Sequence, residues 1–297
     1  MISILIPIYN FDIRKLVLKL NAEAIQKKIV TEILCIDDAS DLNFKDLNTE
    51  ISDFEHVRYL QLEKNIGRSA IRNRLAEEAK FDFLLFIDCD TIPETENYLE
   101  IYFKNLKPGS VLYGGRSYQK NIPEKDFYFH WLYGSRREVA PVTQRNLQPY
   151  QRFMTNNFLI DKNVFLKIKF DEQIRKYGHE DTLFGLELKN RGIEIIHLDN
   201  PMQHIGLEKS ETFIQKTEQA CDNLLMIFQK QDLKKEIKLL RYFLWTGRTK
   251  IHFILLFFYR IFKKIILSNL NGKKPSLLLF DLYKLGYMIE KSKKRTS

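Results

Sequence analysis

A short apolar run that ends in two aspartates constrains the fold of this chain most. The run, Phe83 to Ile87, has the length of a strand and no polar residue, which is typical of a central strand buried on both faces. Asp88 and Asp90 follow it and flank Cys89, so an extended chain would point both carboxylates to the same side. Two carboxylates at the carboxyl end of such a strand can hold a hard divalent cation beside phosphate oxygens, although a solvated turn would also accommodate them.

Strand-like and helix-like segments alternate along the first ninety residues. This alternation is typical of βαβ units, which build an α/β fold with a mostly parallel sheet flanked by helices. Ligands of such sheets bind beyond the carboxyl ends of the strands, and each predicted strand here ends in polar or turn-forming residues. The predicted strands cover residues 3–8, 32–36, 57–62 and 83–87, and the predicted helices cover residues 12–28 and 65–80.

Seven short motifs follow one another at characteristic distances along the chain. They are Ser3–Asn10, Ile36–Ser40, Asn65–Asn73, Phe86–Asp90, Asn156–Ile160, Phe170–Glu172 and Gly178–Asp181. Their order and spacing, from residue 2 to about residue 206, resemble family 2 of the inverting glycosyltransferases, which have the GT-A fold. The resemblance implies a Rossmann-like GT-A catalytic domain over residues 1–207 and a helical, basic extension over residues 208–297.

The resemblance also implies a function. It predicts an enzyme that moves a sugar from a nucleotide-sugar donor, with a UDP-sugar favoured, to a hydroxyl of a glycan or glycolipid acceptor. A nucleotidyltransferase of related fold is one alternative, and it would need a phosphate-bearing substrate and no Glu-Asp base. A non-catalytic nucleotide-sugar-binding protein is the other, and its signature would be altered metal or base positions.

The donor-binding residues implied by the resemblance lie at the predicted strand ends. Tyr9 could stack on the base, and Asp38 could accept a ring N–H of the base; a strand-end aromatic and a turn cap are the structural alternatives. Gly67 permits a close approach of the backbone, and Arg68 or Arg72, with Arg72 favoured, could reach the diphosphate. The full predicted set is Pro7, Tyr9, Asp38, Asn65, Gly67, Arg68, Arg72 and Asp88.

A second group of candidate residues begins a predicted helix near residue 180. In the resembling enzymes the aspartate of the Glu180-Asp181 pair is the general base, which removes the proton of the attacking acceptor hydroxyl. We therefore assign the base to Asp181, and expect Glu180 to contact the acceptor or to orient its neighbour. Carboxylates are also favoured at helix N-termini, so capping is the alternative role.

The predicted metal ligands are Asp90, Asp88 and His204, and the predicted cation is Mn²⁺ or Mg²⁺. His204 follows the predicted strand at 193–198, in the place where some GT-A enzymes have a histidine ligand. His197 lies within that strand and is expected to be structural. Residues 117–151 have many aromatics but no clear periodicity, which suggests an acceptor-binding loop, a hydrophobic lid or a local core. The predicted acceptor-side residues are Trp131 and His179.

The basic character of the chain is confined to its C-terminal part. Residues 230–297 hold 17 Lys/Arg and 4 Asp/Glu, whereas residues 1–229 hold 30 Lys/Arg and 34 Asp/Glu. Charges interrupt the apolar run at 253–267 too soon for a membrane-spanning helix, which needs about 20 mostly uncharged residues. The apolar run and the segment 276–289 together suggest two helices that lie on an anionic membrane surface. The alternative is a helical pair packed on the domain or on a second subunit.

Three cysteines give no disulfide framework, and the chain starts with a predicted strand rather than a basic leader. We therefore expect a cytoplasmic protein, peripheral on the inner face of a membrane. The sequence contains no recognised nucleic-acid motif, so nucleic acid is not an expected partner. Oligomerisation is left open.

Overall fold

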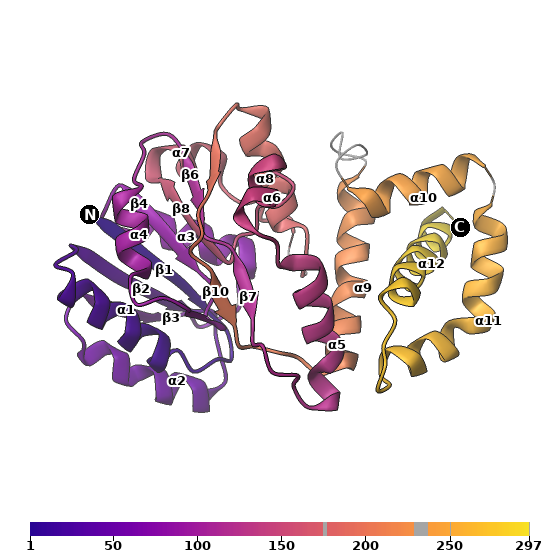
Figure 1. Ribbon diagram of the computed structural model, residues 1–297, viewed down its shortest axis with the longest axis horizontal. Helices are drawn as coiled ribbons and strands as arrows, with labels where there is room; N and C mark the ends of the chain where they lie inside the picture. Colours follow the sequence, from indigo (N-terminus) through magenta and orange to yellow (C-terminus); the bar gives the residue numbers. More distant parts are fainter. Residues whose placement is uncertain (175–176, 229–236, 250, 297) are drawn as a thin grey trace. The chain divides into compact units, whose positions relative to one another are not determined.

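The computed structural model describes residues 1–174, 177–228, 237–249 and 251–296, except for the side chains of residues 294–296 (Figure 1). The chain divides into two compact units. The sheet unit consists of Met1–Gln119, Arg137–Arg175 and Glu180–Gly206. The helical unit consists of Lys120–Arg136, Lys176–His179 and Leu207–Ser297.

The sheet unit is built on a seven-stranded sheet with the order β3-β2-β1-β4-β8-β6-β9. Four neighbouring pairs are parallel, and only β8 runs antiparallel to its neighbours β4 and β6, so the expected mostly parallel sheet is confirmed. The predicted strand at 83–87 matches β4. The strands are β1 (Ile2–Ile8), β2 (Thr31–Asp37), β3 (Val57–Gln61), β4 (Phe83–Ile87), β6 (Val111–Tyr113), β8 (Asn157–Asp161) and β9 (Ile195–His197).

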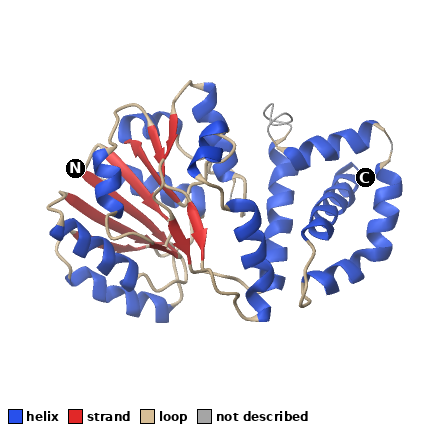
Figure 2. Cartoon of the chain, viewed as in Figure 1, coloured by secondary structure: helices blue, strands red, loops and turns tan. Residues whose placement is uncertain are grey.

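Helices cover both faces of this sheet, which explains why the central strand β4 is apolar at every position (Figure 2). Neighbouring residues of β1 point to opposite faces: Ile4 belongs to the hydrophobic cluster that includes Leu16 of α1, and Leu5 to the one that includes Leu75 of α3. The helices of this unit are α1 (Arg14–Gln26), α2 (Leu42–Thr49), the 3₁₀ turn η1 (Glu50–Asp53), α3 (Arg68–Glu78), α4 (Tyr98–Lys104), α6 (Val142–Leu147), α7 (Lys162–Ile168) and α8 (Glu180–Asn190).

A second, three-stranded sheet lies at the carboxyl end of β4. It consists of β5 (Thr91–Pro93), β10 (Met202–His204) and β7 (Arg116–Tyr118), in that order. β10 is antiparallel to β5 and pairs His204 with Thr91; it is parallel to β7 and pairs His204 with Tyr118. This small sheet therefore fixes what surrounds the residues that directly follow β4.

The helical unit contains α5 (Lys125–Tyr133), α9 (Ser210–Ile227), α10 (Lys238–Arg248), α11 (His252–Leu270) and α12 (Leu277–Thr296). Helix α12 packs against α9, α10 and α11, and the rings of Phe129, Phe213 and Phe280 form an aromatic core with centroids 4.9–5.8 Å apart. The segment 117–151, whose sequence shows no clear periodicity, is largely helical: it contains α5, the π-helical turn η2 (Gly134–Glu138) and α6. None of the helices in the described residues combines the length and hydropathy needed to cross a bilayer.

Candidate functional site

The first aspartate after β4 is held by a buried arginine. Arg72 is almost fully buried in α3, and its Nη2 lies 2.6 Å from Oδ1 of Asp88. Its Nη1 donates to the carbonyl of Arg68, 3.3 Å away, so its guanidinium is fixed from two sides. Breaking such a pair leaves one charge buried alone and destabilises a protein by about 3–5 kcal/mol. Arg72 therefore orients Asp88, while its predicted contact with a diphosphate stays a prediction.

The second aspartate lies beside the predicted histidine ligand. Because β10 pairs His204 with Thr91, the preceding residue Asp90 faces the end of β10, and the N–H of Ile205 donates to its carbonyl at 2.9 Å. Nδ1 of His204 lies 3.5 Å from Oδ1 of Asp90, and that carboxylate oxygen is buried with no hydrogen-bond partner within the described residues. The pairing of the short strands β5 and β10 thus brings together Asp90 and His204, which lie more than one hundred residues apart in the sequence.

A buried arginine and a glutamate, neither foreseen from the sequence, complete this corner. Nη1 of Arg116 donates to Oε2 of Glu138 at 2.9 Å, and Nη2 of Arg116 lies 3.4 Å from Nδ1 of His204. The hydroxyl of Tyr118 donates to the same glutamate oxygen at 2.5 Å. Burial by itself would raise the pKa of Asp90, but His204, Arg116 and Arg68 hold it well below its usual range, so Asp90 is ionised.

These residues fit a divalent cation that also binds a diphosphate. No cluster of three or more His, Cys, Asp or Glu side chains that could hold a metal occurs in the part of the chain that the structure describes. Asp90 and His204 offer one oxygen and one nitrogen ligand, and the ion pair of Asp88 with Arg72 involves its Oδ1. One or two protein ligands are usual where substrate phosphates complete the coordination.

Gly206 gives the first test of this corner. A Cβ atom at residue 206 would lie 2.6 Å from Cβ and 2.9 Å from Oδ2 of Asp90. We expect Gly206→Ala to displace the Asp90 carboxylate, to raise the Mn²⁺ or Mg²⁺ concentration needed for half-maximal turnover, and to destabilise the fold by about 1–3 kcal/mol through overpacking. Metal titrations of turnover and thermal unfolding would measure both effects. In Gly247→Ala, the control, the new Cβ atom would lie 3.7 Å from Nδ1 of His252, which is an ordinary contact, so the metal requirement should stay unchanged.

The donor-side residues at β1 and β2 surround a tightly closed turn. Asp38 accepts hydrogen bonds from the N–H groups of Ile66 at 2.7 Å and Gly67 at 3.0 Å, and Asn65 donates to the Asp38 carbonyl at 3.0 Å. Gly67 has φ 88°, a conformation that suits glycine, and it precedes the first residue of α3. Burial raises the pKa of Asp38, although the two amides act against this.

Tyr9 remains open to solvent next to that turn. It follows Pro7 and Ile8 at the end of β1, and 55% of its surface is exposed. The N–H of Asp38 donates to the carbonyl of Ile8 at 2.8 Å, so the ends of β1 and β2 are joined. An exposed aromatic beside a closed loop is suited to stacking on a flat base. The roles of these donor-side residues remain predictions.

The Glu180-Asp181 pair begins α8, as the sequence predicted for a helix start. Asp181 is half-buried, and its Oδ1 accepts the N–H of Thr182 at 2.6 Å. Burial and the neighbouring Glu180 raise the pKa of Asp181 to about 6, which suits a group that must take up a proton near neutral pH. Glu180 is buried, and its Oε2 has no hydrogen-bond partner among the described residues.

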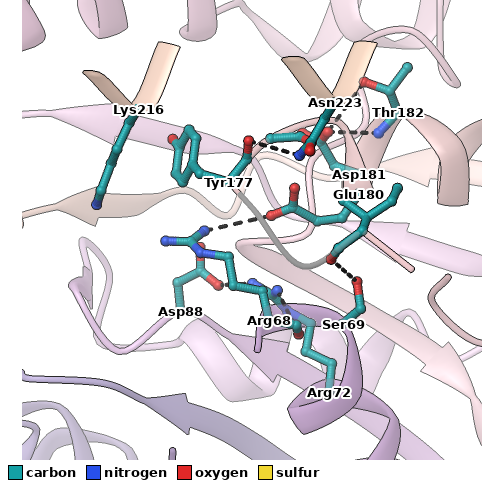
Figure 3. Close-up of polar contacts among 12 residues, drawn as sticks. Arg68, Ser69, Arg72, Asp88, Tyr177, Glu180, Asp181, Thr182, Lys216 and Asn223 are labelled. Carbon is teal, nitrogen blue, oxygen red and sulfur yellow. Dashed lines mark hydrogen bonds and ion pairs between the residues drawn. The ribbon is translucent and has the colours of Figure 1, made fainter. Parts of the chain in front are cut away.

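Arg68 connects the two groups of carboxylates. Its Nη1 lies 3.6 Å from Oε1 of Glu180, and Figure 3 shows its side chain extending toward that glutamate. Its charge also contributes to the low pKa of Asp90. Arg68 is 44% exposed, unlike the buried Arg72, so its guanidinium can still meet a ligand. Asp90, a metal candidate, and Glu180, the neighbour of the base candidate Asp181, thus both interact with one arginine.

The predicted acceptor-side residues belong to the helical unit. Trp131 lies on α5, and His179, with φ 72°, directly precedes α8. Asn223 of α9 donates to the carbonyls of Tyr177 and Gly178 at 3.0 Å, which anchors this segment within its own unit. His197, by contrast, is buried in β9 of the sheet unit, and its Nε2 lies 2.9 Å from the Pro149 carbonyl oxygen. Burial lowers the pKa of His197 to about 4, which is consistent with a structural role.

Comparisons with known proteins agree on one family. The model of Glycosyl transferase family 2 matches residues 3–175, more than half of the chain. Chondroitin synthase of Escherichia coli is 24% identical over 240 residues, which cover 68% of this chain and 34% of that protein. Glycosyltransferase GlyA of Streptococcus pneumoniae is 28% identical over 134 residues, covering 44% of this chain and 19% of that protein. The chain thus spans about a third of the length of the chondroitin synthase and about a fifth of the length of GlyA.

Solved structures show the same fold. The mannosyltransferase PcManGT of Pyrobaculum calidifontis, in complex with GDP-Man and Mn²⁺, has a TM-score of 0.60 at 10% identity, covering 99% of this chain and 86% of that one. The structure of residues 1–349 of S. aureus TarS has a TM-score of 0.52 at 18% identity, and the match covers 100% of this chain and 92% of that one. The sheet unit and the helical C-terminal region therefore form a GT-A fold with a helical extension. The chain is a glycosyltransferase, and it belongs to glycosyl transferase family 2.

Proposed function

We propose that this chain transfers the sugar of a UDP-sugar to a hydroxyl of a glycan acceptor, in a metal-dependent reaction that inverts the anomeric centre. The observation that carries the proposal is the position of Arg68. It lies 3.6 Å from Glu180, next to the proposed base, and its charge acts on Asp90, the proposed metal ligand. A donor diphosphate and an acceptor hydroxyl must meet at such a place for a single displacement to occur.

The proposed reaction needs one proton acceptor and one stabilised leaving group. Asp181 takes the proton of the acceptor hydroxyl as that oxygen forms its bond to the anomeric carbon. The bond between that carbon and the diphosphate oxygen breaks on the opposite side, and the nucleoside diphosphate leaves with the electron pair. No covalent intermediate forms on the enzyme, so the anomeric configuration inverts. The raised pKa of Asp181 supports this role.

The donor would be held by the residues at the strand ends. Tyr9 is the proposed platform for the base, and the closed turn of Asn65, Ile66 and Gly67 on Asp38 forms the wall beside it. Arg68 is the guanidinium available for the diphosphate, while Arg72 keeps Asp88 in place. Asp90 and His204 would hold Mn²⁺ or Mg²⁺, which neutralises charge that develops on the departing diphosphate.

The class of donor and acceptor is proposed from the similar proteins. TarS has been solved with UDP-GlcNAc, and PcManGT with GDP-Man and Mn²⁺, which supports a nucleotide-sugar donor and a metal for this chain. The similarity to the chondroitin synthase of Escherichia coli supports a growing glycan as the acceptor. The predicted acceptor residues Trp131 and His179 remain candidates on this side.

A donor-hydrolysis screen tests the proposal directly. The full chain would be incubated with UDP-, GDP- and dTDP-sugars in the presence of Mn²⁺ or Mg²⁺, and the released nucleoside diphosphate would be measured. We expect hydrolysis of a UDP-sugar in particular. Once an acceptor is found, the anomeric configuration of the product would be determined by NMR. A retained configuration, or release of pyrophosphate instead of a nucleoside diphosphate, would contradict the mechanism.

A further inference from the structure

Helix α11 exposes a continuous apolar face in the helical unit. Seven large side chains, each 43–63% exposed, recur at positions one, four and five residues apart, so they share one side of the helix. We call this set the apolar α11 face. It consists of Phe253, Ile254, Phe257, Phe258, Ile261, Phe262 and Ile265. A contiguous apolar surface of this kind marks an interaction site in a soluble protein.

The opposite side of α11 is well packed, so the exposure is not a consequence of a loosely placed helix. Leu256, Tyr259 and Ile266 are buried, and α11 packs along α12. At Gly286 of α12 a Cβ atom would lie 2.3 Å from the Tyr259 ring, which shows how closely the two helices approach. One face of α11 therefore packs within the helical unit, and the opposite face is exposed and could bind a partner.

Helix α10 adds a face made of two cations and two aromatics. Lys238, Arg241, Tyr242 and Trp245 lie on one side of the helix and line a pocket of about 360 Å³. Tyr242 is 51% exposed and Trp245 is 53% exposed. Tyr and Trp have an apolar ring and a polar group, and they gather where a bilayer meets water. We call these four residues the α10 face.

The charge around both faces is strongly positive. Residues 237–297 hold 14 Lys/Arg and only 2 Asp/Glu. Both acidic residues already have partners: Glu290 pairs with Arg260 at 3.0 Å, and Asp281 with Lys284 at 2.8 Å. Residues 237–297 thus carry a formal net charge of +12, which an anionic surface would neutralise.

We propose that the apolar α11 face and the α10 face dock onto the interface of an anionic lipid bilayer. Phe and Ile side chains would enter the boundary between headgroups and acyl chains, Tyr242 and Trp245 would lie at the headgroups, and Lys and Arg would meet lipid phosphates. A second copy of this chain is a poorer occupant, because its equally basic surface would bring like charges together. This inference concerns a surface of the helical unit and is independent of the proposed catalytic residues.

Vesicle sedimentation of the full chain tests the proposal. We expect it to sediment with vesicles of phosphatidylcholine and phosphatidylglycerol, to bind pure phosphatidylcholine vesicles much less, and to be released in part by high salt. Equal binding to both vesicles, or no binding to either, would overturn it. Point variants are preferred to deletion of residues 250–297, because that deletion would also remove the core residues Phe280 and Tyr283.

Two isoleucines of equal exposure make a matched pair of variants. Ile265 in α11 is 63% exposed, and Ile25 in α1 is 62% exposed. We expect Ile265→Ser combined with Phe257→Ser to require about tenfold more anionic lipid for half-maximal binding, whereas Ile25→Ser should bind like the unchanged protein. If Ile25→Ser weakens binding as much as the α11 variant, the attachment is not specific to this face.

Trp245 provides a second readout that does not depend on sedimentation. The chain has two tryptophans, so Trp131→Phe leaves Trp245 as the only one. We expect its emission to shift to the blue on addition of anionic vesicles and to be quenched by brominated lipids. An unchanged emission would overturn the proposed insertion of the α10 face. Self-association in light scattering that disappears in Phe257→Ser would instead identify a second copy as the occupant.

Discussion

Replacing Asp181 with asparagine should lower kcat by about 10²–10⁴-fold, because the amide keeps the shape of the side chain and cannot accept the acceptor proton. Donor binding should change little, since Asp181 is not among the residues assigned to the donor. Nucleotide affinity by calorimetry and initial rates with donor and acceptor would separate the two effects. Glu187→Gln is the matched control: it makes the same chemical change on α8, where Glu187 is paired only with Arg191 at the surface.

The same residue predicts how the rate depends on pH. The base must be ionised to accept a proton, and the pKa of Asp181 is raised to about 6 in the free protein. We therefore expect kcat/KM to be constant above this value and to fall tenfold per pH unit below it. A profile that stays flat down to pH 4, or a variant Asp181→Asn with nearly normal kcat, would assign the base to another group, and Glu180→Gln would be the next variant.

Removing the cation should have the second large effect. We expect excess EDTA to abolish turnover, and Asp90→Ala to lower it by about 10²-fold or more, because a bound metal stabilises the leaving group by several kcal/mol. The variant should remain folded but unfold at a lower temperature, because the Asp90 carboxylate also balances the charges of Arg116 and Arg68. Asp82→Ala is the control, because Asp82 is exposed at the other end of the same strand. Full turnover in EDTA would contradict the metal requirement.

The fold could be predicted where the local pattern is strong. The apolar run at 83–87 predicts β4, and the alternation of strands and helices predicts the mostly parallel sheet, because a strand buried on both faces has to be apolar throughout. The two helices near the C-terminus were also foreseen, from an apolar periodicity interrupted by cations. Within the proposed site, Asp90 and His204 were predicted as a pair only through the resemblance to a family.

Other features depend on contacts that no local pattern encodes. Strands β5, β7 and β10 have three residues each, which is too short for a period of two to be recognised. The Arg116–Glu138 pair depends on the position of β7, and the ion pair between Arg72 and Asp88 on the rotation of α3. The helices α5 and α6 were missed because their aromatic residues show no clear helical repeat.

The ion pair of Arg72 with Asp88 bears on the life of the protein between catalytic cycles. Two carboxylates after one strand would repel each other if both were left unbalanced, yet Arg72 lies 2.6 Å from one of them and His204 lies 3.5 Å from the other. Arg72 thus balances Asp88, while the charges of Arg116 and Arg68 act on Asp90. The carboxyl end of β4 can therefore hold both aspartates close together without relying on a bound cation to balance their charge.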